Sequence, residues 1–201
     1  MVLLLVHTTF MNSLTSHDLG PASPWVQRWS HLIRPAGRVL DVACGRGRNL
    51  RYLADQGFWV TGVDRSEESL QNASRYGKTV LADIENAPWP LQEKGQIQQF
   101  DAVVITNYLW RPLFPVFEHS LSDGGVLILE TFSQGNETVG KPSRPDFLLR
   151  SGELLSAFTS LHTVAYEEGF LSGPDRFVQR IAAIKTAPVT AHGAIRARYT
   201  L

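Results

Sequence analysis

Two glycines with acidic residues on either side are the positions in this chain best suited to hold a ligand. Gly45 and Gly47 come directly after the apolar run 39–42, which contains Asp41. Glycine adopts positive φ without strain and, because it lacks a Cβ, allows a ligand to touch the backbone. A helix that begins just after the glycines would offer its first unpaired N–H groups to that ligand. The residue types therefore predict a binding turn.

The elements that must position this turn follow from the hydrophobic pattern. Residues 39–42 are typical of a buried strand, and apolar residues at helical spacing after Gly47 predict a helix. A second predicted strand, 58–64, ends in Asp64. In a doubly wound sheet, an acidic residue at this strand end lies beside the first turn and accepts hydrogen bonds from both ribose hydroxyls. The combination predicts a cofactor that contains a nucleoside.

Two residues distinguish between nucleoside cofactors. A dinucleotide-binding turn has the pattern G-x-G-x-x-G, with its third glycine inside the helix. Here Leu50 occupies that position, and Asp41 would repel a pyrophosphate. A cofactor with an amino group and a sulfonium tolerates or uses this negative charge. The sequence thus favours S-adenosylmethionine over NAD.

Residues 41–47 resemble the first motif of the class I S-adenosylmethionine-dependent methyltransferases. The usual form of that motif is D-x-G-x-G-x-G, and Ala43 stands here in place of its first glycine. The resemblance covers most of the chain, from about residue 38 to residue 185. It implies that Asp64 is the family's ribose-binding acid.

The same resemblance implies that the acid after the third strand binds the adenine amino group. That residue is Asp83, with Ile84 as the neighbour whose backbone could contact the ring. The alternative for Asp83 is a structural role in capping or turning the chain. The expected cofactor-binding residues are Asp41, Ala43, Gly45, Gly47, Asn49, Asp64, Arg65, Asp83, Ile84 and Asn107.

The predicted strand 100–107 corresponds in place to the one that carries the family's fourth motif, which faces the transferred methyl group. Asn107 is the best contact candidate there, and the N-P-P-Y form typical of nucleobase and amide methylation is absent. Three residues are candidates for a catalytic role: Tyr108, Arg111 and Glu130. Arg111 could neutralise an anionic substrate or pair with a structural carboxylate. Because no His/Asp or paired-carboxylate arrangement indicates a base, we expect in-line transfer driven by positioning.

Residues 131–149 form a long polar and aromatic loop after the predicted strand 126–130. It leaves the carboxyl end of a strand, the side on which open α/β sheets bind ligands. We interpret it as a substrate lid, the alternative being an irregular surface loop. This loop and residues 148–154 resemble the small bacterial methyltransferases of the tellurite-resistance type and their relatives. The resemblance does not fix the substrate.

The expected fold is α/β: a Rossmann-like, doubly wound, mostly parallel sheet of about seven strands that ends in an antiparallel hairpin. The predicted helices are 24–29, 50–54, 66–76, 112–121 and 151–158, with residues 122–125 ending the fourth, and the hairpin strands are 163–170 and 177–185. We expect one domain over residues 1–201, with 1–22 a mobile arm or lid and 187–201 a frayed tail. The first helix either belongs to the core or covers the cofactor.

Composition limits the partners. Lysine plus arginine and aspartate plus glutamate both number 19 in 201 residues, so no basic footprint for nucleic acid is present. Cys44 is the only cysteine, which excludes an intramolecular disulfide and multi-cysteine metal motifs. It is either a small residue packed under the turn or a reactive thiol. The apolar run 1–6 is too short to span a membrane and lacks signal-peptide features, so we expect a cytoplasmic protein. We also expect no metal site.

The leading functional hypothesis is methyl transfer from S-adenosylmethionine to a small-molecule acceptor. A NAD-dependent oxidoreductase shares the strand, turn and helix with Asp64, and is the first alternative. The second is a non-catalytic binding module that keeps the methyltransferase fold. The sequence leaves the acceptor atom and the oligomeric state open.

Overall fold

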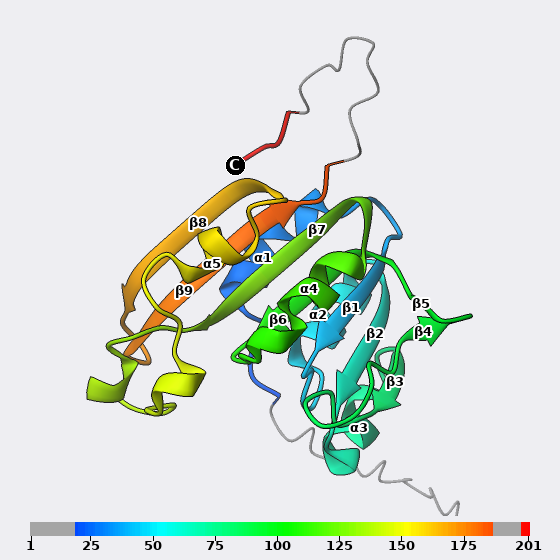
Figure 1. Ribbon diagram of the computed structural model, residues 1–201. Helices are drawn as coiled ribbons and strands as arrows, with labels where there is room; N and C mark the ends of the chain where they lie inside the picture. Colours follow the sequence, from blue (N-terminus) through cyan, green and yellow to red (C-terminus); the bar gives the residue numbers. More distant parts are fainter. Residues whose placement is uncertain (1–18, 187–197) are drawn as a thin grey trace, which may run out of the picture.

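The computed structural model describes residues 19–186 and 198–201 and contains the predicted α/β sheet (Figure 1). Seven strands lie in the order β3-β2-β1-β6-β7-β9-β8. Five of them pair in parallel, and β9 is antiparallel to both β7 and β8. The strands are β1 Arg38–Val42, β2 Trp59–Asp64, β3 Lys78–Leu81, β6 Phe100–Thr106, β7 Leu121–Phe132, β8 His162–Leu171 and β9 Arg176–Ile184. The expected doubly wound sheet with a closing hairpin is confirmed.

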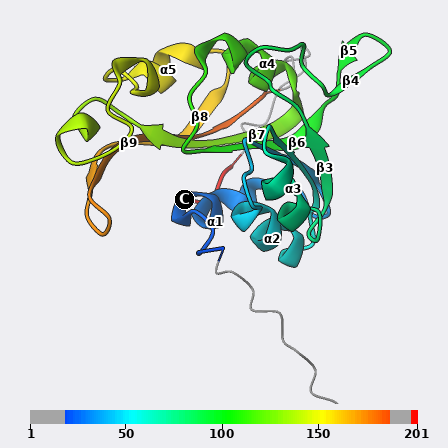
Figure 2. The ribbon, with the colours of Figure 1, turned by 90° about the horizontal axis from the view of Figure 1, so that it is seen from below.

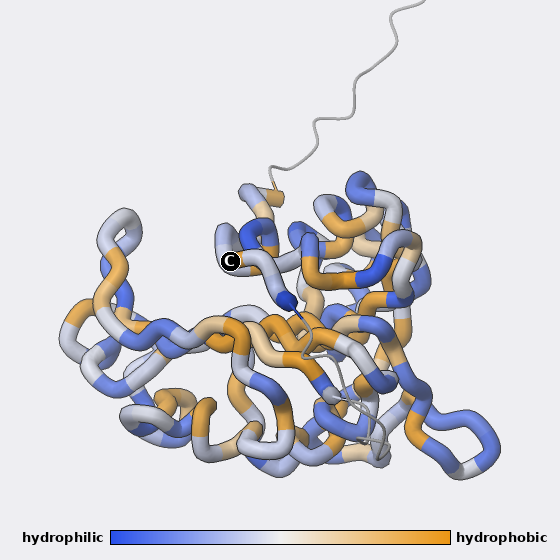
Figure 3. The backbone as a smooth tube through the Cα atoms, turned by 90° about the horizontal axis from the view of Figure 1, so that it is seen from above, coloured by the Kyte–Doolittle hydropathy of each residue, from blue (hydrophilic) through white to orange (hydrophobic). Residues whose placement is uncertain are grey.

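Helices cover both faces of the sheet, as Figure 2 shows. One face carries α1 (Pro24–Trp29), the 3-10 turn Ser30–Leu32, α2 (Arg48–Asp55) and α3 (Glu67–Ala73). The other carries α4 (Phe114–His119), preceded by the 3-10 turn Arg111–Leu113, and α5 (Glu153–Ala157). The helices of each layer pack against the sheet, and each face has its own hydrophobic cluster. Because both faces are covered, the central strands are almost continuously apolar, and Figure 3 shows hydrophobic segments gathered there.

The first helix belongs to the core. Trp25 and Trp29 are each 1% exposed, and the Trp25 indole N–H donates to the Ile181 carbonyl oxygen at 3.2 Å. The Ser23 hydroxyl caps the helix by accepting from the N–H groups of Trp25 and Val26. Of the predicted arm, residues 1–18 lie outside the described residues. The contacts of α1 favour the core role over that of a cofactor cover.

The structure corrects the predicted boundary between the fourth helix and the next strand. The helix ends at His119, and residues 122–125 belong to β7, which begins at Leu121. A register shift between Phe100 and Ala102 lets the irregular start of β7 remain paired with β6. Gly124, with φ 78°, donates its N–H to the Lys185 carbonyl oxygen, so the glycine pair bends the strand where we predicted a turn. On the other face, α3 ends three residues earlier than predicted, at Ala73.

Two further segments differ from expectation. The predicted loop before β6 contains a small antiparallel hairpin, β4 (Gln92–Glu93) with β5 (Gln96–Ile97). Its turn residues Lys94 and Gly95 both have positive φ, the conformation that a tight hairpin requires. In the predicted frayed tail, Tyr199 stacks on His162 with ring centroids 5.4 Å apart; residues 187–197 lie outside the described residues.

Within residues 19–186 and 198–201, none of the helices has the length and apolarity needed to cross a membrane.

Candidate functional site

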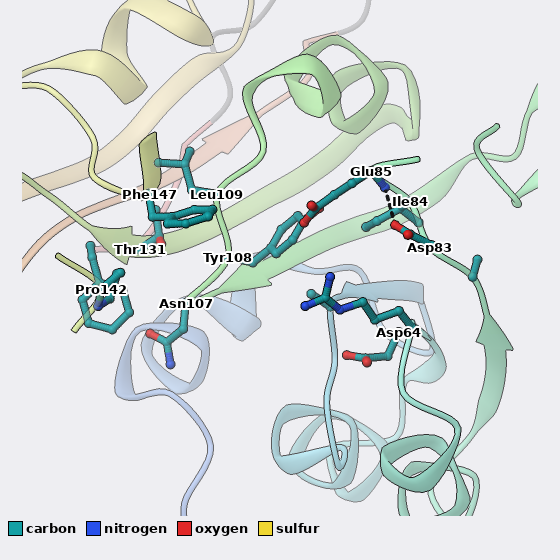
Figure 4. Close-up of a pocket in the computed structure, with 14 residues that line it drawn as sticks. Asp64, Asp83, Ile84, Glu85, Asn107, Tyr108, Leu109, Thr131, Pro142 and Phe147 are labelled. Carbon is teal, nitrogen blue, oxygen red and sulfur yellow. Dashed lines mark hydrogen bonds between the residues drawn. The ribbon is translucent and has the colours of Figure 1, made fainter. Parts of the chain in front are cut away.

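A cavity of about 390 Å³ opens at the carboxyl ends of the parallel strands (Figure 4). Seven of the residues that the sequence singled out line it: Ala43, Asp64, Arg65, Asp83, Ile84, Asn107 and Tyr108. Its other lining residues are Ala82, Glu85, Leu109 and, from the 131–149 loop that we interpreted as a substrate lid, Thr131, Phe132, Pro142 and Phe147. Asp64, Asp83 and Ile84 lie at one end of this cavity, Pro142 and Phe147 at the other, and Tyr108 between them.

Six of the predicted residues do not line this cavity: Asp41, Gly45, Gly47, Asn49, Arg111 and Glu130. Gly45 and Gly47 form the turn beneath it. Gly45 has φ 53°, and a Cβ built on it would meet nothing within 4 Å. A Cβ on Gly47 would lie 3.0 Å from Ala73, so this glycine permits close packing of α2 on α3. The backbone next to the cavity is therefore accessible at Gly45, whereas Gly47 has a packing role.

Ala43 occupies the position of the motif's first glycine in a left-handed conformation, with φ 53°. A non-glycine residue there is strained by roughly 1 kcal/mol. We expect Ala43→Gly to raise the free energy of unfolding by about 1 kcal/mol, measured by urea titration. Ala54→Gly, inside α2, is the matched control and should lower it by about 0.5–1 kcal/mol. A fall in stability with Ala43→Gly would contradict the inferred strain.

Asp64 connects the end of β2 to the glycine turn. Its Oδ2 accepts from the Gly45 N–H at 2.8 Å and its Oδ1 from the Ser66 N–H at 2.9 Å. A carboxylate has about four acceptor sites, so two remain for other donors. A pair of adjacent hydroxyls on a ligand in the cavity matches these remaining acceptors.

Asp83 both turns the chain and lines the cavity. Its carboxylate accepts from the Asn86 side-chain amide at 2.9 Å. It also accepts from the N–H of Glu85 at 3.1 Å, the contact drawn in Figure 4. The Asn86 amide is the main reason that the pKa of Asp83 lies below its usual value, so the group is a permanent acceptor at neutral pH. Ile84, 8% exposed, offers an apolar surface beside it. Asp83 therefore has the structural role in the turn, and its position in the cavity lining also allows it to contact a ligand.

Asp41 is a buried carboxylate without a partner. It is 1% exposed, and neither oxygen has a hydrogen-bond partner among the described residues. Burial raises its pKa to about 7 and Asp64 adds to the shift, whereas Arg48 and the nearby Asn49 amide, which lies outside hydrogen-bond geometry, oppose it. Such an unmatched negative charge beneath the glycine turn attracts a cation placed there. With the accessible backbone at Gly45, it fits a cofactor that carries an ammonium and a sulfonium.

Tyr108 is placed at the middle of the cavity but is unsuited to act as a base. Burial raises the pKa of its hydroxyl above the usual value, and the Glu85 carboxylate raises it further. The phenol is therefore neutral at pH 7, where it can donate or accept a hydrogen bond but does not act as a base. Asn107, with φ 58°, holds its position through its N–H, which donates to the Glu130 carbonyl oxygen at 2.9 Å.

Arg111 takes the structural alternative left open by the sequence. Its guanidinium forms a bidentate ion pair with Glu153, with 2.9 Å between Nη2 and Oε2. It also donates to the carbonyl oxygens of Asp146 and Leu148, at 2.8 and 2.9 Å. These two carbonyls flank Phe147, a cavity residue. Arg111 thus holds the returning arm of the 131–149 loop, and its donors are used within the protein.

This arrangement predicts the effect of Arg111→Ala on the loop. Loss of the contacts should weaken local protection by about 1–3 kcal/mol, seen as roughly ten- to a hundredfold faster hydrogen exchange at the Phe147 and Leu149 amides. Arg144→Ala is the control, because its exposed pair with Asp146 contributes little and its guanidinium, 5.3 Å from the Phe147 ring centroid, contacts that side chain and not the backbone. Equal exchange in both variants would contradict this role for Arg111.

Glu130 and Asn49 belong to a buried polar network around the start of α1. The Ser23 hydroxyl donates to Glu130 Oε1 at 2.9 Å, and Arg180 Nη1 lies 3.3 Å from Oε2. The Ser23 N–H donates to Asn49 Oδ1 at 3.0 Å, and Asn49 donates to the Thr106 hydroxyl. Neither residue lines the cavity described above, which we call the first cavity. Their contacts connect α1 to the carboxyl ends of β6 and β7.

Cys44 is a packed residue under the turn, as the structural alternative expected. Its side chain lies against Gly62, where a Cβ would come within 2.6 Å of the sulfur atom. Burial is also the main cause that raises the pKa of its thiol, so the reactive thiolate is disfavoured.

A second cavity of about 270 Å³ adjoins the first and shares Asn107 and Phe132 with it. Glu130 lines its inner side, and Lys141, Asp175 and Arg176 come from the 131–149 loop and the β8–β9 turn. Lys141 belongs to the loop that we interpreted as a substrate lid. Arg176 could not be predicted, because nothing in a hairpin sequence indicates that it faces the end of another strand.

The 131–149 loop contains local structure. It starts within β7, contains the 3-10 turns Asn136–Thr138 and Pro145–Phe147, and returns beside β7 through an isolated bridge between Ser133 and Leu149. Asn136 fixes its middle by donating to the Pro142 carbonyl oxygen and accepting from the Phe177 N–H. The loop therefore supplies one wall of the first cavity.

Comparisons with known proteins agree with this arrangement. Residues 39–125 match the family described as "Methyltransferase domain". A putative methyltransferase of Bacillus subtilis, YqeM, is 35% identical over 106 residues, covering 49% of this chain and 40% of the relative. The ubiquinone biosynthesis O-methyltransferase of Bordetella avium is 32% identical over 96 residues, covering 46% and 39%. The chain thus matches about two fifths of the length of these relatives.

Solved structures share the fold. TehB from Haemophilus influenzae superposes with a TM-score of 0.67 at 21% identity, covering 85% of this chain and 64% of that one. A TehB-like SAM-dependent methyltransferase from Corynebacterium glutamicum gives 0.58 at 18% identity, covering 81% and 87%. The comparisons thus confirm a resemblance to methyltransferase domains over residues 39–125 and a fold shared with the TehB type. The family match ends at residue 125, before the loop that walls the far end of the first cavity.

Proposed function

We propose that this chain, a class I S-adenosylmethionine-dependent methyltransferase by motif and fold, binds that cofactor in the first cavity and methylates a small-molecule acceptor. The observation that supports this most is Asp64, which accepts from the Gly45 N–H and keeps acceptor sites toward the cavity. The ribose hydroxyls would bind to Asp64, and the adenine would lie between Asp83 and Ile84. We also propose that residues 1–201 form a single methyltransferase domain.

The charged end of the cofactor would lie over the glycine turn. Asp41 supplies the unmatched negative charge there, and Gly45 the accessible backbone. The sulfonium and its methyl group would then face Asn107, at the carboxyl end of β6. Arg65 lines the same cavity beside Asp64 and would cover the nucleoside.

Bound S-adenosylmethionine supplies an electrophilic methyl group, so the chain's own residues have only to position the acceptor and exclude water. Tyr108 stays protonated, Glu130 is ion-paired with Arg180, and Arg111 is engaged with Glu153. None of these three is free to act as a base. Positioning alone can supply about 7–11 kcal/mol of the barrier in well-oriented reactions. Phe132 and Phe147 shield the acceptor end from water.

The oxidoreductase alternative is less compatible with this geometry. Leu50, at the position of the third dinucleotide glycine, is fully buried in the cluster under α2. Asp41 places a negative charge beneath the turn where a pyrophosphate would lie. The non-catalytic alternative is disfavoured by the second cavity, which leaves room for an acceptor next to Asn107.

Two measurements test the proposal. Calorimetry should detect S-adenosylhomocysteine binding to the full chain, and no binding of NAD. Labelled methyl groups from S-adenosylmethionine should then enter the low-molecular-weight fraction of a cell extract. Binding of NAD alone would favour the oxidoreductase, and label confined to protein or RNA would contradict a small-molecule acceptor.

A further inference from the structure

The second cavity is placed where an acceptor has to lie. It shares Asn107 and Phe132 with the first cavity, and Asn107 stands at the carboxyl end of β6, next to the proposed methyl position. A molecule that occupies the junction would therefore contact the cofactor on one side and the second cavity on the other. The residues that line the two cavities therefore indicate the chemical class of that molecule.

The wall of the first cavity at the junction is apolar. Leu109, Phe132, Pro142 and Phe147 line it, and the last two are at the end opposite Asp83 (Figure 4). The Arg111 contacts with the carbonyl oxygens of Asp146 and Leu148 hold the backbone on either side of Phe147. This wall suits an apolar or aromatic body rather than a sugar or a peptide.

The second cavity carries unused positive charge. The side chains of Lys141 and Arg176 line it and make no hydrogen bond or ion pair within the described parts of the chain. Arg48 also lines it, but its guanidinium already donates to the Pro21 carbonyl oxygen and the Thr106 hydroxyl. Lys141 and Arg176 are therefore the cations available to a ligand.

The acidic residues of the cavity do not cancel this charge. Glu130 accepts from the Ser23 hydroxyl and lies 3.3 Å from Arg180, which it shares with Glu167. Asp175 is the remaining acid among the cavity's lining residues, and it is exposed. The lining therefore holds three cations, Arg48, Lys141 and Arg176, against two acids, Glu130 and Asp175, which leaves an excess of positive charge at the end away from the nucleoside.

We infer that the acceptor is a small organic acid, whose apolar body lies against Phe132 and Phe147 and whose anionic oxygens meet Lys141 and Arg176. This inference rests on the proposed function and names its substrate class. The sequence offered Arg111 for neutralising an anionic substrate. Because Glu153 and two carbonyls occupy Arg111, that role passes to the loop lysine and the hairpin arginine.

Matched pairs of ligands test the inference by binding. Calorimetry on the full chain saturated with S-adenosylhomocysteine would compare para-mercaptobenzoate, para-hydroxybenzoate and para-aminobenzoate with their uncharged carboxamides. We expect at least one acid to bind about five- to tenfold more tightly than its amide, as two partly exposed charge pairs allow. In the double variant Lys141→Met, Arg176→Met that preference should fall to about twofold or less. The same acids are candidates for methylation with labelled cofactor.

The control variant is Lys78→Met, which removes a lysine at the start of β3, at the opposite end of the sheet. It should leave the preference unchanged. Equal binding of acids and amides, binding of neither, or a preference that survives the double variant would overturn the inference. Weaker S-adenosylhomocysteine binding in the double variant would assign the two cations to the cofactor carboxylate and would also overturn it. Failure of the wild-type chain to bind S-adenosylhomocysteine would instead remove the proposed function itself.

Discussion

Asp64→Asn is expected to weaken S-adenosylhomocysteine binding at least about a hundredfold. Hydrogen bonds to a charged group contribute about 1.5–3 kcal/mol each, and the proposed ribose contact uses two of them. The amide has only one acceptor oxygen, yet Gly45 and Ser66 both direct N–H groups at this side chain. One of these donors would face an NH₂ group, so the turn beneath the cofactor would also be displaced. Calorimetry at one pH measures the loss.

A folding control separates binding from collapse of the turn. Asp55→Asn removes a carboxylate from the exposed end of α2 and should bind as the wild type does. The Asp64→Asn chain should keep its far-ultraviolet circular dichroism spectrum, because Asp64 is not a core residue. Affinity within about fivefold of the wild type would show that the nucleoside is not bound at Asp64.

The fold was predictable because its signals are local. The apolar strands, the glycine turn and the strand-end acids occur in chain order, and the parallel sheet follows from that order. The errors fell where tertiary pairing overrides local signals. The bent start of β7 depends on partners in β6 and beyond β9, at Phe100 and Lys185. Lys94 and Gly95 form the turn of the β4–β5 hairpin, but the polar residues around them led us to predict a loop.

The nucleoside end of the site was also predictable, but the acceptor end was not. Asp64 and Asp83 are recognisable as acids at strand ends, and both line the first cavity. Glu130 looked like a candidate base because it too ends a predicted strand, but Arg180, fifty residues away in sequence, occupies it. Arg176 lines the second cavity from the β8–β9 hairpin. The sequence predicts that hairpin but does not show that it pairs with β7. Long-range contacts decide such roles, and a single sequence does not contain them.

Asp41→Asn is expected to stabilise the free protein at pH 8 and to weaken cofactor binding at the same pH. The pKa of Asp41 is about 7 in the folded chain, against an ordinary value of 3.8 for an aspartate. Between these values the folded state retains a proton that the unfolded state has lost, so stability falls as pH rises from about 4 to 7. The penalty above pH 7 is at most about 4 kcal/mol, at 1.36 kcal/mol per pKa unit.

Asparagine has nearly the shape of the protonated acid and carries no such penalty. Urea titrations should therefore give similar stabilities for the wild type and Asp41→Asn near pH 4. At pH 8 the variant should be the more stable by about 2–4 kcal/mol. A difference that is independent of pH would mean that Asp41 is not a strained charge.

The binding data should move in the opposite direction, because the same unmatched charge is proposed to attract the cofactor's ammonium. At pH 8 we expect Asp41→Asn to bind S-adenosylhomocysteine about ten- to a hundredfold more weakly, and near pH 5.5, where Asp41 is protonated, to match the wild type. Methylthioadenosine, which has no ammonium, should bind both proteins equally at either pH. If it lost affinity in the same proportion, Asp41 would act by shaping the turn. A loss with S-adenosylhomocysteine alone would mean that the chain tolerates a destabilising buried carboxylate because its cofactor neutralises it.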